Sequence, residues 1–174
     1  MIDSVNKGDA SLDNHFYKNN IKSLKACVSP SGDIPETFSH KISVLATASG
    51  QPTLRFANIL LHSSYDPEKE AHRFADKLQA EACVCLYGFG LGYHLKAILD
   101  KIGPKGYLLV IELNPDILTA ALKLRDHTKI FEDNRFRLIY GTDEAEVSRE
   151  IAHEMSRLTR EHTDQLEVLF HAPS

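Results

Sequence analysis

The chain has 174 residues, of which 43% are apolar and 25% are charged, enough for one core with a small subdomain. Its net charge of −4 mixes both signs, which gives no basic surface for nucleic acid or for an acidic membrane. No apolar run reaches the ~18–20 residues of a membrane span, and the polar start MIDSVNKGDASLD lacks the apolar core of a secretory signal.

The first third of the chain predicts a small α+β subdomain, which we place at 1–62. Residues 1–12 are expected to be loosely attached, and a helix is expected from Asp13, a candidate cap. Its apolar positions recur at helical spacing: Phe16, Tyr17, Ile21, Leu24 and Val28. Strands are expected over 41–47 and 53–61, and the turn composition of 49–52 joins them in a β-hairpin.

A further helix is predicted from Pro67 to about residue 80. Asp66 can cap it, Pro67 fits the first helical position, and Glu68 and Glu70 complement the helix dipole in the first turn. An apolar stripe then recurs at helical spacing along Ala71, Phe74, Ala75 and Leu78.

From residue 83 the pattern alternates between strands and helices. Strands are expected over 83–87, 107–112, 136–140 and 166–170, with helices over 91–101, from Asn114-Pro115 onward, and over 144–160. Continuous apolar strands alternating with helices indicate a parallel sheet covered by helices. We therefore expect an α/β fold, a Rossmann-like partial parallel sheet with helices on both faces, over 63–174.

Cysteine and histidine usage indicates no metal site. Cys83 and Cys85 lie on one face of an apolar strand, and the total of three cysteines is odd, which suits neither a disulfide framework nor a zinc knuckle. None of the nine histidines has metal-ligand spacing. We expect buried, reduced thiols in a cytoplasmic protein.

The glycine turn after the strand 83–87 is the first candidate site. Gly88, Gly90 and Gly92 allow a sharp turn and close approach of a ligand to the backbone. The following helix directs its free N–H groups at that turn, which favours an anionic or polar ligand. Tyr93 and His94, in its first turn, are in a position to contact a phosphate or carboxylate.

Two acids and a short polar segment complete the candidate site. Glu112 ends the next strand, 24 residues after Gly88, where an acid binds ribose hydroxyls in dinucleotide folds. Asp143 follows the strand 136–140. Each has a structural alternative, because Glu112 can cap the helix at Pro115 and Asp143 the helix at 144. His62, Ser63 and Tyr65 are not needed to cap their helix and are candidate cleft-lining residues.

The glycine spacing is GxGxG, since position 93 is tyrosine and not the glycine or alanine of GxGxxG. This spacing resembles that of S-adenosylmethionine-dependent methyltransferases over about residues 83–143. The resemblance implies that the glycines approach the ligand's amino-acid moiety, that Glu112 holds its ribose and that Asp143 lies near its adenine. The sequence departs from the pattern at Leu86, where methyltransferases carry an acid, and after the fourth strand, where only 171–174 follow.

A second resemblance covers about residues 13–174. The segments 61–71 and 87–94, with the FYKNN of 16–20 and the VLFHAPS of 168–174, resemble the N-terminal region of the motility-associated factor family. These bacterial proteins glycosylate flagellin with nonulosonic, sialic-acid-like sugars. The resemblance implies flagellin as a partner, and a transferase centre for a CMP-activated sugar in a following domain. Most of the sugar-transfer residues are then expected outside this chain, which would be an excised domain or a short relative, and its catalytic residues stay unknown.

Three functions stay open at this point. The first is an accessory domain of a flagellin glycosyltransferase, and the second is a methyltransferase-like domain. The third is a non-catalytic interaction module, because a half-sheet leaves a strand edge for a missing domain or for a homo-oligomer. The candidate ligands are a CMP-sugar or another nucleotide and S-adenosylmethionine.

Overall fold

The computed structural model describes residues 14–29, 33–161 and 166–170. The expectations for 1–12, for a cap at Asp13 and for the terminal residues 171–174 lie outside this part of the chain. Among the described residues, no helix combines the length and apolar character needed to cross a membrane.

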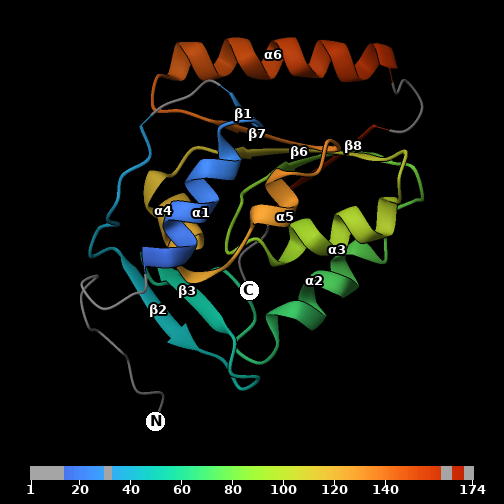
Figure 1. The fold of residues 1–174 in the computed structure, drawn as a ribbon. Coiled ribbons are helices and arrows are strands. Elements are labelled where there is room, and N and C mark those ends of the chain that lie inside the picture. Colours follow the sequence, from blue (N-terminus) through green and yellow to red (C-terminus); the bar gives the residue numbers. More distant parts are fainter. Residues whose placement is uncertain (1–13, 30–32, 162–165, 171–174) are drawn as a thin grey trace.

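A five-stranded parallel sheet forms the centre of the fold, as the apolar runs predict (Figure 1). Four strands have the expected bounds: β5 (Cys83–Tyr87), β6 (Tyr107–Glu112), β7 (Phe136–Tyr140) and β8 (Leu166–Phe170). The spatial order of the strands is β1-β7-β6-β5-β8. From β5 the chain adds β6 and β7 on one side, and it then returns to place β8 on the other side of β5. Strand order reverses between β5 and β8, which is the switch point of a Rossmann-like fold.

Helices cover both faces of this sheet. Figure 1 shows α6 (Glu144–Glu161) alone on one face, with α1 (Asn14–Leu24), α3 (Tyr93–Ile102), α4 (Pro115–Leu124) and α5 (Thr128–Phe131) on the other. α2 (Pro67–Ala75) packs against α3. The short α5 is not among the helices predicted from the sequence.

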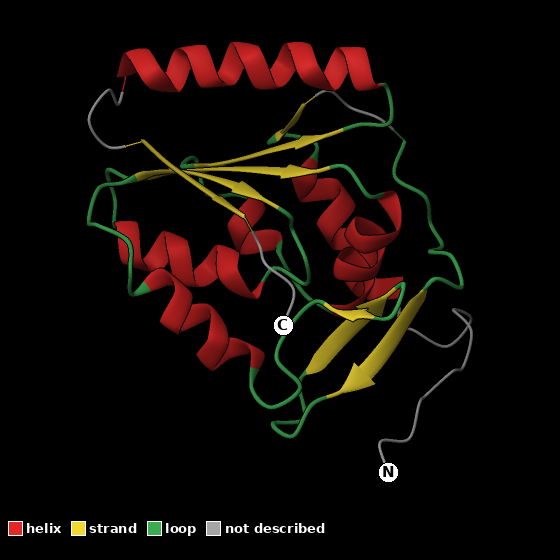
Figure 2. Ribbon diagram, turned by 180° about the vertical axis from the view of Figure 1, so that it is seen from behind, coloured by secondary structure: helices red, strands yellow, loops and turns green. Residues whose placement is uncertain are grey.

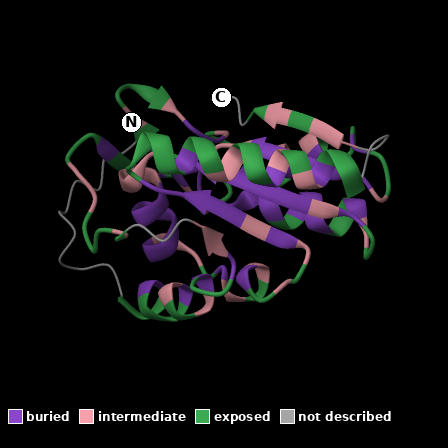
Figure 3. Ribbon diagram, turned by 90° about the horizontal axis from the view of Figure 1, so that it is seen from above, coloured by how far each residue is buried: buried purple, intermediate pink, exposed green. Residues whose placement is uncertain are grey.

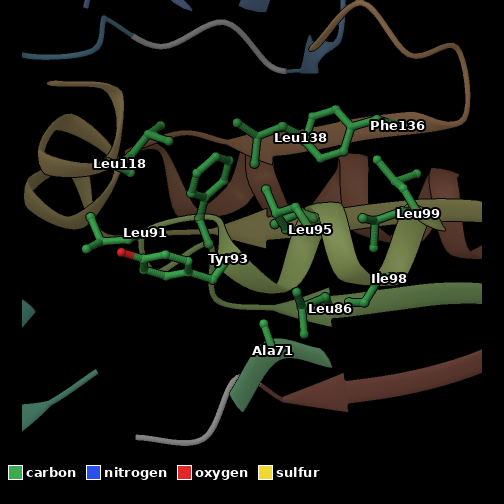
Figure 4. Packing of buried hydrophobic residues seen from close by; sticks show 14 of the residues in the cluster. Ala71, Leu86, Leu91, Tyr93, Leu95, Ile98, Leu99, Leu118, Phe136 and Leu138 are labelled. Carbon is green, nitrogen blue, oxygen red and sulfur yellow. The ribbon is translucent and has the colours of Figure 1, made fainter. Parts of the chain in front are cut away.

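Two apolar layers hold the helices to the sheet. Below the sheet, Leu86 and Leu138 of the strands pack with Leu95 and Ile98 of α3 and Leu118 of α4 (Figure 4). On the other face a smaller cluster joins the sheet to α6: Cys83, Cys85, Leu109, Ile111, Ile139, Val147 and Leu158. Seen from above, the inner strands are buried, whereas β8 exposes part of its length (Figure 3).

The expected buried thiols are present. Cys27, Cys83 and Cys85 are all free and buried. Burial raises the pKa of each thiol to about 11, so all three are protonated and weakly reactive at neutral pH.

A second, three-stranded antiparallel sheet lies on the far side of the helices from the central sheet (Figure 2). The predicted hairpin is its first pair, β2 (Ile42–Ala46) and β3 (Pro52–Phe56). The single strand expected over 53–61 is wrong, because Ala57 and Asn58 both adopt positive φ and turn the chain into β4 (Ile59–Leu60). Two successive left-handed residues form the tight turn that suits a hairpin.

The helix expected to include Val28 ends earlier. α1 stops at Leu24, and Val28 and Ser29 form β1, which pairs with β7 in the central sheet. The expected boundary at residue 62 therefore does not coincide with the boundary between the two sheets. A two-residue strand has no periodicity of its own, so the apolar Val28 extended the helical pattern.

Helix starts agree with the capping signals. The Asp66 carboxylate accepts a hydrogen bond from the Lys69 amide at 2.9 Å, and Pro67 takes the first helical position. Asn114 caps α4 in the same way, accepting from the amides of Asp116 and Ile117. These caps satisfy backbone donors that the helix itself cannot pair.

We predict that Asn20→Ala lowers the free energy of unfolding by about 3 kcal/mol. Asn20 is fully buried, and its side chain donates to the carbonyls of Leu122 and Arg125 and accepts from the His127 amide. Alanine leaves these three backbone groups without their partner. Urea unfolding followed by circular dichroism measures the loss. The neighbouring exposed Asn19→Ala is the control, and equal losses in both variants would contradict this role for Asn20.

Candidate functional site at the glycine turn

The glycine turn lies where strand β5 ends and helix α3 begins. Gly88, Gly90 and Gly92 have φ of +102°, +54° and +74°, a region that only glycine adopts without strain. Between them, Phe89 and Leu91 point into the core and are 1% and 0% exposed. The alternating spacing thus serves to bury every second side chain while the backbone turns.

Glu112 lies beside this turn, as predicted, but its carboxylate binds the protein's own backbone. Oε2 accepts from the Phe89 amide and Oε1 from the Asn114 amide, each at 2.8 Å. The side chain is 5% exposed. Burial raises the pKa of Glu112, an effect that hydrogen bonds from backbone amides, those of Phe89 and Gly90 included, oppose. Ribose binding by Glu112 stays a prediction, and a ribose hydroxyl would have to share these oxygens with the backbone amides of Phe89 and Asn114.

His62 provides the second side-chain acceptor of the turn. Its Nε2 accepts from the Leu91 amide at 2.7 Å, which places the ring proton of the neutral imidazole on Nδ1, 3.9 Å from Oε2 of Glu70. The ring is fully buried, stacks on His94 at 5.8 Å and meets the Tyr93 ring edge-on. His62 therefore lies behind the turn, where it supports Leu91, and not on a cleft wall.

Two further turn amides donate to backbone carbonyls. The Gly88 amide donates to the Ile111 carbonyl at 2.9 Å, and the Gly92 amide donates to the Phe89 carbonyl at 3.0 Å. The Gly90 amide helps to lower the pKa of Glu112. Four of the five amides from 88 to 92 thus donate within the protein, and a ligand at any of these four would have to displace an existing bond.

Tyr93 connects the turn to the small sheet. Its hydroxyl donates to the Pro52 carbonyl at 2.7 Å, and the Arg125 guanidinium lies 3.8 Å from the centre of its ring. Burial raises the pKa of Tyr93. A cation–π contact and a part-buried hydrogen bond thus hold this side chain between Arg125 and β3. Contact between Tyr93 and a ligand stays a prediction.

His127 packs directly against Gly92, a contact that no sequence motif indicated. A Cβ at Gly92 would lie 2.4 Å from Cε1 of His127, and the His127 ring meets Phe89 edge-on. Burial, aided by the nearby Arg125 charge, lowers the pKa of His127 to about 3. The histidine is therefore neutral at physiological pH and closes the outer side of the turn.

Asp143 lies apart from the turn and is exposed. Its carboxylate accepts from the Glu146 amide at 2.8 Å and so caps α6, which is the structural alternative considered for it. Contact with an adenine stays a prediction.

Two of the candidate cleft-lining residues, together with His94, which is also a candidate for that role, share a cavity of about 740 Å³ beside α2. Ser63, Tyr65 and His94 line it, with His94 buried at its inner end. Within the described ranges, no cluster of three or more histidine, cysteine, aspartate or glutamate side chains is arranged to hold a metal ion.

A family model matches most of the chain. The model described as the glycosyltransferase Maf N-terminal domain matches residues 13–171. Ribosomal RNA small subunit methyltransferase H from Shewanella pealeana and from Shewanella halifaxensis is 34% identical over 53 residues. That match covers 30% of this chain and 15% of each methyltransferase, so it spans a small part of those proteins.

Two solved structures align with part of this chain. The spermidine synthase from Thermotoga maritima aligns with a TM-score of 0.45 at 17% identity, over 60% of this chain and 38% of that chain. The Aeropyrum pernix fibrillarin, solved with natively bound S-adenosyl-L-methionine, aligns with a TM-score of 0.34 at 14% identity, over 67% of this chain and 57% of that chain.

We expect Gly92→Ala to destabilise the protein far more than Gly50→Ala. Gly50 has φ of +82° and nothing within 4 Å of a built Cβ, so alanine there adds only backbone strain, about 1 kcal/mol. At Gly92 the same strain is joined by overlap with His127, for a total of about 3 kcal/mol. Thermal unfolding of both variants measures the difference. Equal losses would show that His127 moves aside freely.

Acid should destabilise the protein partly through His127. The unfolded histidine titrates near 6.5 and the folded one near 3, so between these values only the unfolded state is protonated at this residue. This contribution lowers the free energy of unfolding by roughly 1.4 kcal/mol per pH unit below 6.5. In urea unfolding across this range, His127→Asn should show a shallower pH dependence than the wild type. An unchanged slope would contradict a neutral, buried His127.

Proposed function

This chain belongs to the Maf glycosyltransferase N-terminal domain family, and on that premise we propose that it is an accessory domain of a bacterial flagellin glycosyltransferase. The sugar transferred would be a nonulosonic, sialic-acid-like one. The observation that carries the accessory role is the closed glycine turn, in which the amides of Gly88, Phe89, Leu91 and Gly92 all donate to acceptors within the protein. The turn thereby serves to join β5, β6 and α3.

A nucleotide site on this fold would need backbone amides at the turn that do not already donate within the protein. It would also need an acid on β6 whose carboxylate accepts no hydrogen bond from the protein itself. Here Phe89 and Leu91 fill the interior of the turn, and both oxygens of Glu112 are in use. We therefore assign transfer from the CMP-activated sugar to another domain of the same protein. In this proposal flagellin is the acceptor, and the present chain supports the transferase domain or binds flagellin.

A methyltransferase-like domain is the second candidate. The GxGxG spacing, the place of Glu112 at the end of β6 and the 34% identity to methyltransferase H over 53 residues favour it. Against it, Leu86 is fully buried where methyltransferases carry an acid. S-adenosylmethionine would also have to break the bonds between Glu112 and the turn.

A cytoplasmic location completes the proposal. It is supported by three free thiols in the described part of the chain, all of them buried and protonated. Reducing compartments keep cysteines in this state.

The test compares wild type with Glu112→Gln in the protein that carries this chain together with the transferase domain. Glutamine places an N–H group against a backbone amide, so the variant should lose about 2 kcal/mol of stability. Sugar transfer to flagellin per folded molecule, measured by intact mass, should be unchanged. Calorimetric titration of either protein with S-adenosylmethionine should give no saturable heat.

Two outcomes would contradict this function. Saturable binding of S-adenosylmethionine by the wild type that is lost in Glu112→Gln would favour the methyltransferase candidate. Full transfer activity and full stability in a protein lacking residues 1–174 would leave no accessory role.

A further inference from the structure

The cavity beside α2 is separate from the glycine turn, and its lining includes three cationic side chains. It has a volume of about 740 Å³, within the range of small-molecule sites. Helix α2 forms one wall, on the opposite side of the sheet from α6 (Figure 1), and His94 of α3 lies at the inner end. The full lining is Ser63, Tyr65, Asp66, Lys69, Glu70, Arg73, Phe74, Lys77 and His94.

Three cations line the cavity along α2 and just beyond its end. Lys69, Arg73 and Lys77 are spaced four residues apart, so on a helix they lie on one side at intervals of about 6 Å. All three are exposed, and within the described residues none of them makes an ion pair with a carboxylate.

The two carboxylates of the cavity do not neutralise these three cations. Asp66 accepts from the Lys69 amide and caps the helix. Glu70 accepts from the Ser63 amide at 2.9 Å and lies toward His62. Both acids are therefore held at the start of α2, and among the described residues neither forms an ion pair with Arg73 or Lys77.

Rings form the apolar part of the same cavity. Phe74 meets His94 edge-on at 4.8 Å, and His94 in turn stacks on His62. Tyr65, 76% exposed, adds an aromatic side chain to the lining. Cationic groups beside ring faces suit a ligand that has both an anionic group and a ring.

We propose that this cavity binds a small organic dianion, a ring compound with phosphate or carboxylate groups. Arg73 offers a planar fork that matches either group, and Lys69 and Lys77 add point charges on both sides of it. The ring of the ligand packs against Phe74 and His94. The inference rests on the cavity alone and is independent of the function proposed above.

The His62 ring links this cavity to the glycine turn and supplies a readout. His94 stacks on His62, which accepts from the Leu91 amide. A ligand that contacts His94 should therefore shift the Leu91 amide resonance, although Leu91 itself is fully buried.

The experiment titrates the chain with phenyl phosphate, phthalate and inorganic phosphate, followed by calorimetry and by amide NMR shifts. Phenyl phosphate or phthalate should bind, and which of them binds more tightly tells whether phosphate or carboxylate is preferred. Inorganic phosphate, which lacks a ring, should bind at least about tenfold more weakly. Arg73→Gln should weaken binding by about tenfold, and added salt should weaken it further.

Arg149→Gln is the matched control. Arg149 is also exposed on a helix and its replacement removes the same charge, but it lies on α6 across the sheet. Because Arg73 is exposed, Arg73→Gln should keep the wild-type melting temperature. The proposal fails if neither ring compound binds at millimolar concentration. It also fails if Arg73→Gln binds like wild type, or if both arginine variants lose affinity equally.

Discussion

The fold depends on supplying acceptors for the buried amides of a single turn. Five consecutive residues after β5 leave the sheet in conformations that only glycine allows at every second position. Their N–H groups are shielded from water, and an unpaired buried donor costs roughly 1–3 kcal/mol. Glu112 from β6 and His62 from the segment before α2 provide the two side-chain acceptors. The turn is therefore held from two directions by residues far from it in sequence.

This arrangement also organises the layer of helices. Once His62 is fixed by the Leu91 amide, its ring stacks on His94, and His94 in turn meets Phe74 of α2. On the other side of the turn, Tyr93 reaches the small sheet, so that sheet, α2 and α3 are connected through the same few residues. Asn20 of α1 also connects separate elements, because its side chain binds backbone groups of α4 and of the segment before α5.

A glycine turn with an acid on the next strand is compatible with several functions. The hydrogen-bond acceptors of the turn's backbone amides distinguish between these functions. In this chain they face Glu112, His62 and backbone carbonyls, which favours a structural turn in an accessory domain. The unpaired charge lies elsewhere, along one side of α2 beside the 740 Å³ cavity. The part of the molecule suited to a ligand is thus not the part that carries the recognisable motif.

The sequence by itself determined the α/β class, the bounds of four central strands, the cap at Asp66 and the helix start at Asn114-Pro115, because these depend on local periodicity and on neighbouring residues. It placed Glu112 beside the turn, since strand ends of a parallel sheet share an edge. Only the tertiary structure decided that Val28 forms a strand and that Glu112 and His62 bind the turn's own amides. Those outcomes depend on contacts between distant segments, and a buried donor takes whichever acceptor the packed fold brings to it.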